Sequence, residues 1–186
     1  MVCPASLKHQ WDRERRRFAG RAPVLVEGAA RERRSRYAGA PFVVAHYEQI
    51  YRDRRFLRES EIAWDVVVLD EAQRIKNWRA RTSDAVKDLR ERCRFAFVLS
   101  GTPLENNLEE LYSVCQFVDP SALGPLWDFH DRYYRLDEAG RVLGYRNLDA
   151  LRGRLAPVCL RRTKEDVQPQ LPERVVNRFH LALTPQ

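Results

Sequence analysis

Two acidic residues at the end of an apolar run are the side chains best placed for chemistry. Asp70 and Glu71 follow the segment 64–69, whose β-branched residues predict a buried strand. A buried parallel strand delivers such carboxylates to the carboxyl edge of a sheet, where open α/β folds bind their ligands. Asp70 could hold Mg²⁺ against phosphate oxygens, and Glu71 could orient and deprotonate a water. Alternatively, the pair could simply cap the element after the strand, because acids are favoured at helix N-termini.

A turn of small hydrogen-bonding residues follows a second apolar run. Ser100, Gly101 and Thr102 come directly after residues 95–99, and a helical pattern starts at Leu108. Taken alone, this segment could be an ordinary strand–turn–helix connection in which Ser and Thr satisfy backbone groups.

The elements that must position these residues alternate along the chain. Short β-branched runs and charged stretches of helical period predict a parallel sheet covered by helices. We expect strands at residues 1–3, 24–26, 42–45, 66–69 and 95–99, and helices at residues 6–18, 47–59, 82–92 and 108–117. After Pro120 the apolar residues recur at helical spacing up to Tyr134, and a turn follows near Gly140, which predicts a helical appendage.

Composition sets broad limits on the function. The chain has 186 residues and a net charge of +7, which favours a polyanionic partner only weakly because 26 acidic residues are interspersed with the basic ones. Its 4 cysteines form no C-x-x-C pair, so neither a zinc site nor a disulfide framework is indicated. We found no apolar stretch long enough to cross a bilayer. We therefore expect a cytoplasmic protein, nucleoid-associated if bacterial and nuclear if eukaryotic.

Taken together, the two strand ends resemble a known family. Asp70-Glu71-Ala72-Gln73 and Ser100-Gly101-Thr102-Pro103 resemble motifs II and III of superfamily-two helicases, and the longer stretch 99–111 resembles the Swi/Snf family of DNA-dependent ATPases. Three further stretches resemble other motifs of that family: 3–11 (motif Ia), 43–48 (motif Ib) and 160–167 with Leu171-Pro172 (the connector toward a second lobe).

The resemblance implies an α/β fold and a division of the chain. It implies a partial RecA-like parallel sheet with flanking helices at residues 1–118, a small helical insertion at 119–157, and a connector at 158–186. Residues 175–183 alternate weakly and could be a strand or a linker.

The resemblance also implies roles for individual residues. Asp70 would hold Mg²⁺ and Glu71 would activate water for ATP hydrolysis, while Gln73, Ser100, Gly101 and Thr102 would couple the nucleotide state to DNA grip. The family usually has His where Gln73 stands. Gln can donate and accept hydrogen bonds but cannot become positively charged.

Duplex DNA, bound without sequence specificity, is the implied partner. The candidate contacts are Ser6, His46, Tyr47, Lys76 and Asn77, although each could also be a solvated or capping residue. We assign Trp11 and Trp64 to core packing, because each adjoins an expected apolar face.

One expected part of the site does not occur in the sequence. No Lys follows a Gly, so the chain contains no G-x-x-x-x-G-K-[ST] phosphate loop. The resemblance places that loop upstream of residue 1 and places transition-state arginines in a second lobe. We therefore expect ATP and Mg²⁺ to act in a complete protein, the 186 residues alone to be inactive, and apolar strand surface to be left uncovered. Two alternatives remain open at this point: a non-catalytic DNA-binding remnant of the same fold, and an RNA helicase, which the stretches 99–111 and 160–167 disfavour.

Overall fold

Five parallel strands form the centre of the molecule. The computed structural model describes residues 1–101, 108–162 and 166. The order across the sheet is β2-β3-β1-β4-β5, and the strands are β1 (Val2–Cys3), β2 (Val24–Leu25), β3 (Val43–His46), β4 (Trp64–Asp70) and β5 (Cys93–Leu99). All five predicted strands are confirmed. The strand β1 has only 2 residues but lies centrally, and it pairs Val2 with Ala45 of β3 and with Leu69 of β4.

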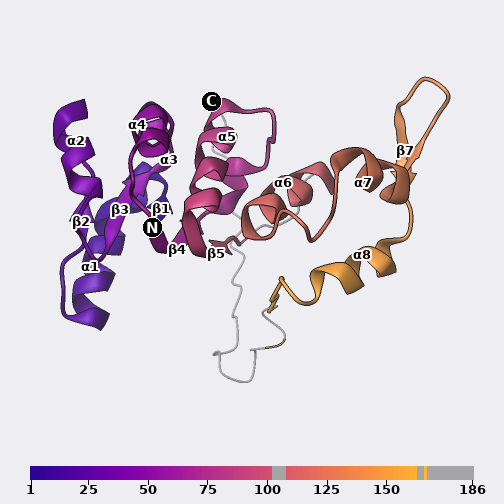
Figure 1. The fold of residues 1–186 in the computed structure, drawn as a ribbon. Helices are drawn as coiled ribbons and strands as arrows, with labels where there is room; N and C mark the ends of the chain where they lie inside the picture. Colours follow the sequence, from indigo (N-terminus) through magenta and orange to yellow (C-terminus); the bar gives the residue numbers. More distant parts are fainter. Residues whose placement is uncertain (102–107, 163–165, 167–186) are drawn as a thin grey trace, which may run out of the picture.

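Helices connect the strands and lie on both faces of the sheet. They are α1 (Lys8–Ala19), α2 (Ala30–Tyr37), α3 (Tyr47–Arg52), α4 (Arg54–Glu59) and α5 (Arg81–Lys87), with 3-10 turns at Ala5–Leu7, Ala72–Ile75 and Asp88–Arg92. Connections between parallel strands are right-handed, so the direction in which a connection crosses the sheet decides the face on which its helix lies. The β1-to-β2 connection runs toward the β2 edge, and the other connections run toward β5. The helix α1 therefore lies on the opposite face from α3 and α5 (Figure 1).

Two helical features differ from the sequence expectation. The expected helix at 47–59 is broken at Asp53, which ends α3 and precedes α4, and whose buried carboxylate is held by Arg33. The helix α2 was not expected, because its sequence is rich in Arg and lacks an apolar period. Its first turn is fixed by the Glu32 carboxylate, which accepts a hydrogen bond from the Ala29 backbone amide.

One face of the sheet is well covered and the other is not. Leu69 of β4 is fully buried in the main core, together with residues of α3 and α5. Apolar side chains on the opposite face of β4 and β5 are half exposed: Val66 (45%), Phe95 (49%), Phe97 (54%) and Leu99 (44%). Uncovered apolar strand surface is therefore confirmed for the described residues.

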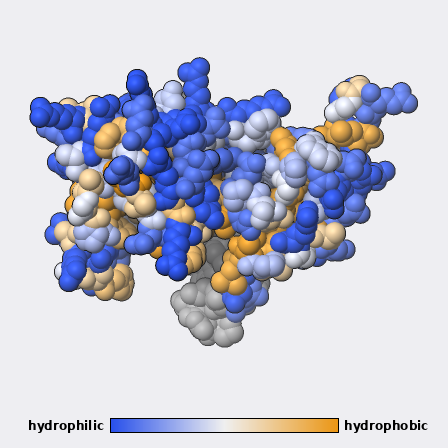
Figure 2. All heavy atoms as spheres, in the orientation of Figure 1, coloured by the Kyte–Doolittle hydropathy of each residue, from blue (hydrophilic) through white to orange (hydrophobic). Residues whose placement is uncertain are grey.

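A smaller unit follows the sheet. The helix α6 (Leu108–Val118) contributes to the main core and to a second core, which is centred on Phe129 and built with α7 (Leu126–Tyr133) and α8 (Leu148–Leu155). The expected helical insertion also contains an antiparallel hairpin, β6 (Tyr134–Leu136) and β7 (Val142–Tyr145), which turns at the predicted Gly140. Figure 2 shows hydrophobic surface next to this hairpin and mostly hydrophilic surface over α2 to α5.

The domain boundary predicted at residue 118 coincides with the end of α6, and the division into three units stays a prediction. The predicted connector beyond residue 162 and the alternating segment 175–183 lie outside the described residues, apart from Asp166. Within the described parts of the chain, no helix is long and apolar enough to span a membrane.

Candidate functional site

The predicted site residues lie where parallel strands end. Ser6 follows β1, His46 ends β3, Asp70 ends β4 and Ser100 follows β5. The register pairs Cys3 with His46 and Asp70 with Leu99. The fold therefore brings these residues to one edge of the sheet, the carboxyl edge at which ligands bind in this class of fold.

Both oxygens of the Asp70 carboxylate accept hydrogen bonds. The Glu71 backbone amide donates to Oδ1 over 3.0 Å. The indole Nε1 of Trp11 donates to Oδ2 over 2.8 Å. This bond of Trp11 was not predicted, and its assignment to core packing stays a prediction, whereas Trp64 does pack against the main core as expected. Each carboxylate oxygen keeps further lone-pair capacity for another ligand.

Glu71 has an unusual backbone conformation for a residue with a side chain. Its φ of 52° and ψ of 54° lie in the left-handed region, which costs about 1–2 kcal/mol for an L-amino acid. Such strain concentrates at functional sites, where surrounding structure enforces it. The strained residue here is the one that the sequence picks out as the water-activating base.

A hydrogen-bonded chain links Glu71 to the end of the next strand. Gln73 Nε2 donates to Glu71 Oε2 over 2.6 Å, and Ser100 Oγ donates to Gln73 Oε1 over 3.0 Å. Gln73 therefore uses both its donor and its acceptor, as its amide allows. Three residues that the sequence assigned to catalysis and coupling are brought into direct contact.

The other two predicted coupling residues are less informative. Gly101 is exposed, and a Cβ built there meets nothing within 4 Å. Thr102 lies outside the described residues.

Tyr47 is placed differently from the other predicted DNA contacts. Its side chain is 1% exposed, and its hydroxyl donates to the Asp70 backbone carbonyl over 2.7 Å. Burial, followed by the Asp70 charge, raises the pKa of Tyr47. In this structure Tyr47 packs beneath the end of β4 and is buried as a whole residue, so it presents no surface for the predicted DNA contact.

The remaining four predicted DNA contacts are at least partly accessible. Ser6 and Asn77 are exposed. His46 Nδ1 lies 2.9 Å from Glu48 Oε2, and Lys76 Nζ lies 3.5 Å from Glu110 Oε1. A phosphate that bound Lys76 would compete with an existing carboxylate partner.

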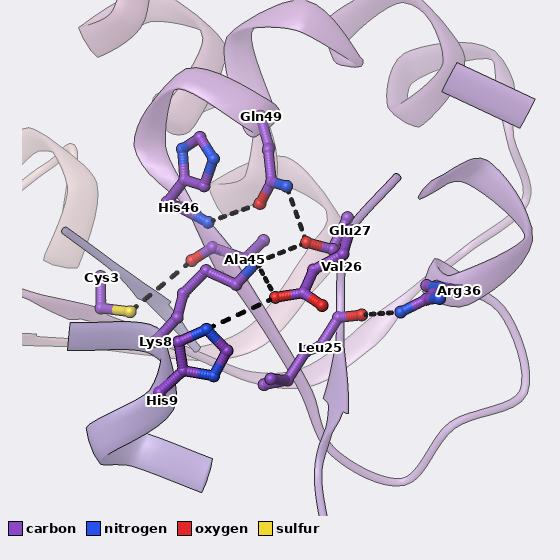
Figure 3. A network of polar contacts seen from close by, with 10 residues as sticks. All are labelled: Cys3, Lys8, His9, Leu25, Val26, Glu27, Arg36, Ala45, His46 and Gln49. Atoms are coloured by element: carbon purple, nitrogen blue, oxygen red, sulfur yellow. Dashed lines mark hydrogen bonds and ion pairs between the residues drawn. The ribbon is translucent and has the colours of Figure 1, made fainter. Parts of the chain in front are cut away.

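A buried polar network that was not predicted from the sequence lies behind this edge. Lys8 is 5% exposed, and its Nζ donates to Val26 O over 2.6 Å and to Glu27 Oε1 over 3.1 Å. Gln49 Nε2 donates to the same Val26 carbonyl over 2.7 Å. Figure 3 shows Lys8 of α1 and Gln49 of α3 converging on the end of β2. A sequence signal for it is the spacing of Lys8 and Trp11, which places both side chains on one face of a helix.

Comparison with known proteins supports the resemblance. The family model described as the SNF2-related domain matches residues 1–186. The human TATA-binding protein-associated factor 172 is 33% identical over 200 residues, covering 100% of this chain and 11% of that protein. The putative ATP-dependent helicase/translocase YwqA of Bacillus subtilis is 33% identical over 191 residues, covering 99% of this chain and 20% of that protein.

A solved structure agrees with the fold. The Sulfolobus solfataricus SWI2/SNF2 ATPase core in complex with dsDNA matches with a TM-score of 0.71 at 29% identity, covering 90% of this chain and 34% of that one. The chain thus spans about a tenth to a fifth of those curated relatives. The RecA-like α/β fold expected from the sequence is confirmed, and the chain belongs to the SNF2-related domain family.

Proposed function

We propose that this chain forms part of the first motor lobe of an ATP-dependent DNA translocase that remodels protein–DNA complexes. The observation that carries the proposal is the hydrogen-bonded chain from Glu71 through Gln73 to Ser100, beside the carboxylate of Asp70. It joins the ends of two adjacent strands through the residues that nucleotide chemistry would need.

Asp70 fits the role of a Mg²⁺ ligand. Among the described residues, no group of three His, Cys, Asp or Glu side chains could cage a metal. Mg²⁺ at nucleotide sites is bound by one or two carboxylates together with phosphate oxygens and waters, so a single oriented carboxylate suits it. The bound ion would neutralise charge developing on the phosphates during transfer.

Glu71 fits the role of a base that positions water. Glu71 has a left-handed backbone conformation directly after Asp70. We propose that the two neighbouring carboxylates have different tasks, Asp70 as a metal ligand and Glu71 as a base. Gln73 donates to one carboxylate oxygen, which fixes the side chain while the other oxygen can accept a proton from water.

Gln73 and Ser100 would carry the nucleotide state to the segment after β5. A shift of Glu71 on phosphate release would alter its bond to Gln73, and hence the bond from Ser100. Gly101 and Thr102 follow directly in the chain, so the turn could re-form its hydrogen bonds as the nucleotide changes.

Duplex DNA is the proposed track, contacted by Ser6, His46, Lys76 and Asn77 at the same edge. Such contacts to the phosphate backbone give grip without reading sequence. A second RecA-like lobe and a phosphate loop from outside these 186 residues would complete the nucleotide site.

DNA binding can be tested by fluorescence anisotropy with labelled duplex DNA and single-stranded RNA over a range of salt. We expect tighter binding to the duplex, and Lys76→Ala should reduce the salt slope by about one. The matched control is Arg55→Ala, on the exposed α4 surface that leads into the start of β4. Equal or tighter RNA binding, or an unchanged slope in Lys76→Ala, would contradict the proposal.

A further inference from the structure

Trp11 makes a polar contact that core packing does not require. Its Nε1, the single polar atom of the side chain, donates to Asp70 Oδ2 over 2.8 Å across 59 residues of sequence. Trp11 is partly buried, as is its bond to Asp70. The contact joins α1 to the end of β4.

The helix that carries Trp11 is fixed one turn earlier. Lys8, three residues before Trp11, is anchored at the end of β2 through Val26 O and the Glu27 carboxylate (Figure 3). Residues three apart share one face of a helix. One face of α1 therefore contacts the end of β2 through Lys8 and the end of β4 through Trp11.

Among the described residues, three different segments hold Asp70 at three points. Trp11 holds Oδ2, the Glu71 amide holds Oδ1, and the Tyr47 hydroxyl holds the backbone carbonyl at 2.7 Å. Of these three contacts, the Tyr47 bond reaches only the backbone, and the Glu71 amide is the neighbour of Asp70 in the sequence. The Trp11 bond is the one by which a distant side chain fixes the rotation of the carboxylate. Because the indole is uncharged, it orients the carboxylate without neutralising it.

We propose that Trp11 is a positioning residue for Asp70, setting the carboxylate orientation in which it binds a divalent cation. The inference rests on the proposed metal-binding role of Asp70. Ser6, a proposed DNA contact, lies in the 3-10 turn that leads into α1 at Lys8, so a displacement of α1 by DNA would reach the metal-binding carboxylate through one hydrogen bond.

Trp11→Phe separates positioning from mere anchoring of α1, since it keeps a ring and removes the donor. Partners that orient metal-binding side chains typically change metal affinity by about 10-fold or more when removed. We expect Trp11→Phe to weaken binding of Mn²⁺, used as a probe for Mg²⁺, by about that factor with little change in melting temperature. A residue that only anchored the helix would lower the melting temperature and leave the affinity unchanged.

The experiment titrates the full 186-residue chain with Mn²⁺ and follows free Mn²⁺ by EPR. In parallel, ¹⁵N spectra identify which indole N–H signal Mn²⁺ broadens, and we expect that of Trp11. Trp64→Phe, at the opposite end of β4, is the matched control and should bind Mn²⁺ as the parent does. If Trp11→Phe does not fold, benzothienylalanine in place of Trp11 replaces the N–H by sulfur with nearly unchanged shape.

The outcomes distinguish this inference from the proposed function. If Asp70→Asn leaves Mn²⁺ binding and the broadening unchanged, the metal-binding role of Asp70 fails. If Asp70→Asn removes binding but Trp11→Phe matches the parent within about twofold, well short of the expected loss, the positioning role alone is overturned. Weakening in both variants, with Trp64→Phe unchanged, supports both.

Discussion

Replacing Arg33 by Met should strongly destabilise the fold, because it leaves the buried charge of Asp53 without its cationic partner. The Asp53 carboxylate is 1% exposed and the Arg33 side chain 13% exposed. Arg33 donates to both carboxylate oxygens, over 2.9 Å and 2.7 Å. This bidentate bond to Asp53 raises the pKa of Arg33. Removing one partner of such a pair costs about 3–5 kcal/mol.

The structure favours the lower end of that range. Tyr37 OH donates to Asp53 Oδ2 over 3.2 Å and would remain in Arg33→Met. At about 2–4 °C per kcal/mol for a chain of this size, a loss of about 3 kcal/mol should lower the melting temperature by about 6–12 °C.

Thermal unfolding followed by circular dichroism would measure the Arg33→Met shift. The control is Arg55→Met, whose partner Glu59 is also exposed, at side-chain exposures of 89% and 63%, and which should leave the melting temperature unchanged. A loss below about 1 kcal/mol in Arg33→Met would refute the assignment of Asp53 as a buried, paired charge, because it lies well under the cost expected for such a pair.

Three further predictions concern the uncovered sheet face, a buried lysine and the motif II chain. Phe97 is 54% exposed, so Phe97→Ser should cost little stability and should reduce aggregation of the protein, as measured by light scattering. Unchanged aggregation in this variant would argue against the exposed sheet face as its cause. Burial lowers the pKa of Lys87 to about 8. Since the unfolded chain keeps that proton to about pH 10.5, stability measured by urea unfolding should rise with pH between those values in the parent but not in Lys87→Met, and parallel curves would contradict this. Gln73→Leu should lower the free energy of unfolding by about 1–3 kcal/mol, because it removes the hydrogen bonds to Glu71 and Ser100. Gln73→Glu should keep only the bond from Ser100. An unchanged free energy of unfolding in Gln73→Leu, measured with urea, would show that these hydrogen bonds do not form in solution.

The sequence was sufficient for the sheet because its strands are short apolar runs between charged segments. The strand predicted at residues 66–69 was recognised from β-branched residues followed by two acids, and in the structure it runs from Trp64 to Asp70. The helix α2 could not, because it is held by polar contacts from Arg33 and Glu32 rather than by an apolar stripe. The hairpin at Gly140 was recognised only as a turn, since each of its strands has 4 residues or fewer.

Part of the candidate site could also be predicted, because several of its residues follow directly from the strands. Asp70, Glu71, Gln73 and Ser100 end strands, so the carboxyl-edge rule places them together. The bond from Trp11 to Asp70 spans 59 residues and depends on how α1 is set against the sheet. Likewise, the burial of Tyr47 follows from its packing under the end of β4, which no local pattern reveals.

The central claim is that Glu71 activates water for ATP hydrolysis in a DNA-dependent motor. Its most direct test is phosphate release by a chimera in which this chain replaces the matching third of the Sulfolobus core, 34% of that protein. We expect turnover stimulated by duplex DNA, a loss of at least about 100-fold in Glu71→Gln, and no turnover by the 186-residue chain alone. Turnover that survives Glu71→Gln, or a folded chimera that binds duplex DNA without hydrolysing ATP, would contradict the claim.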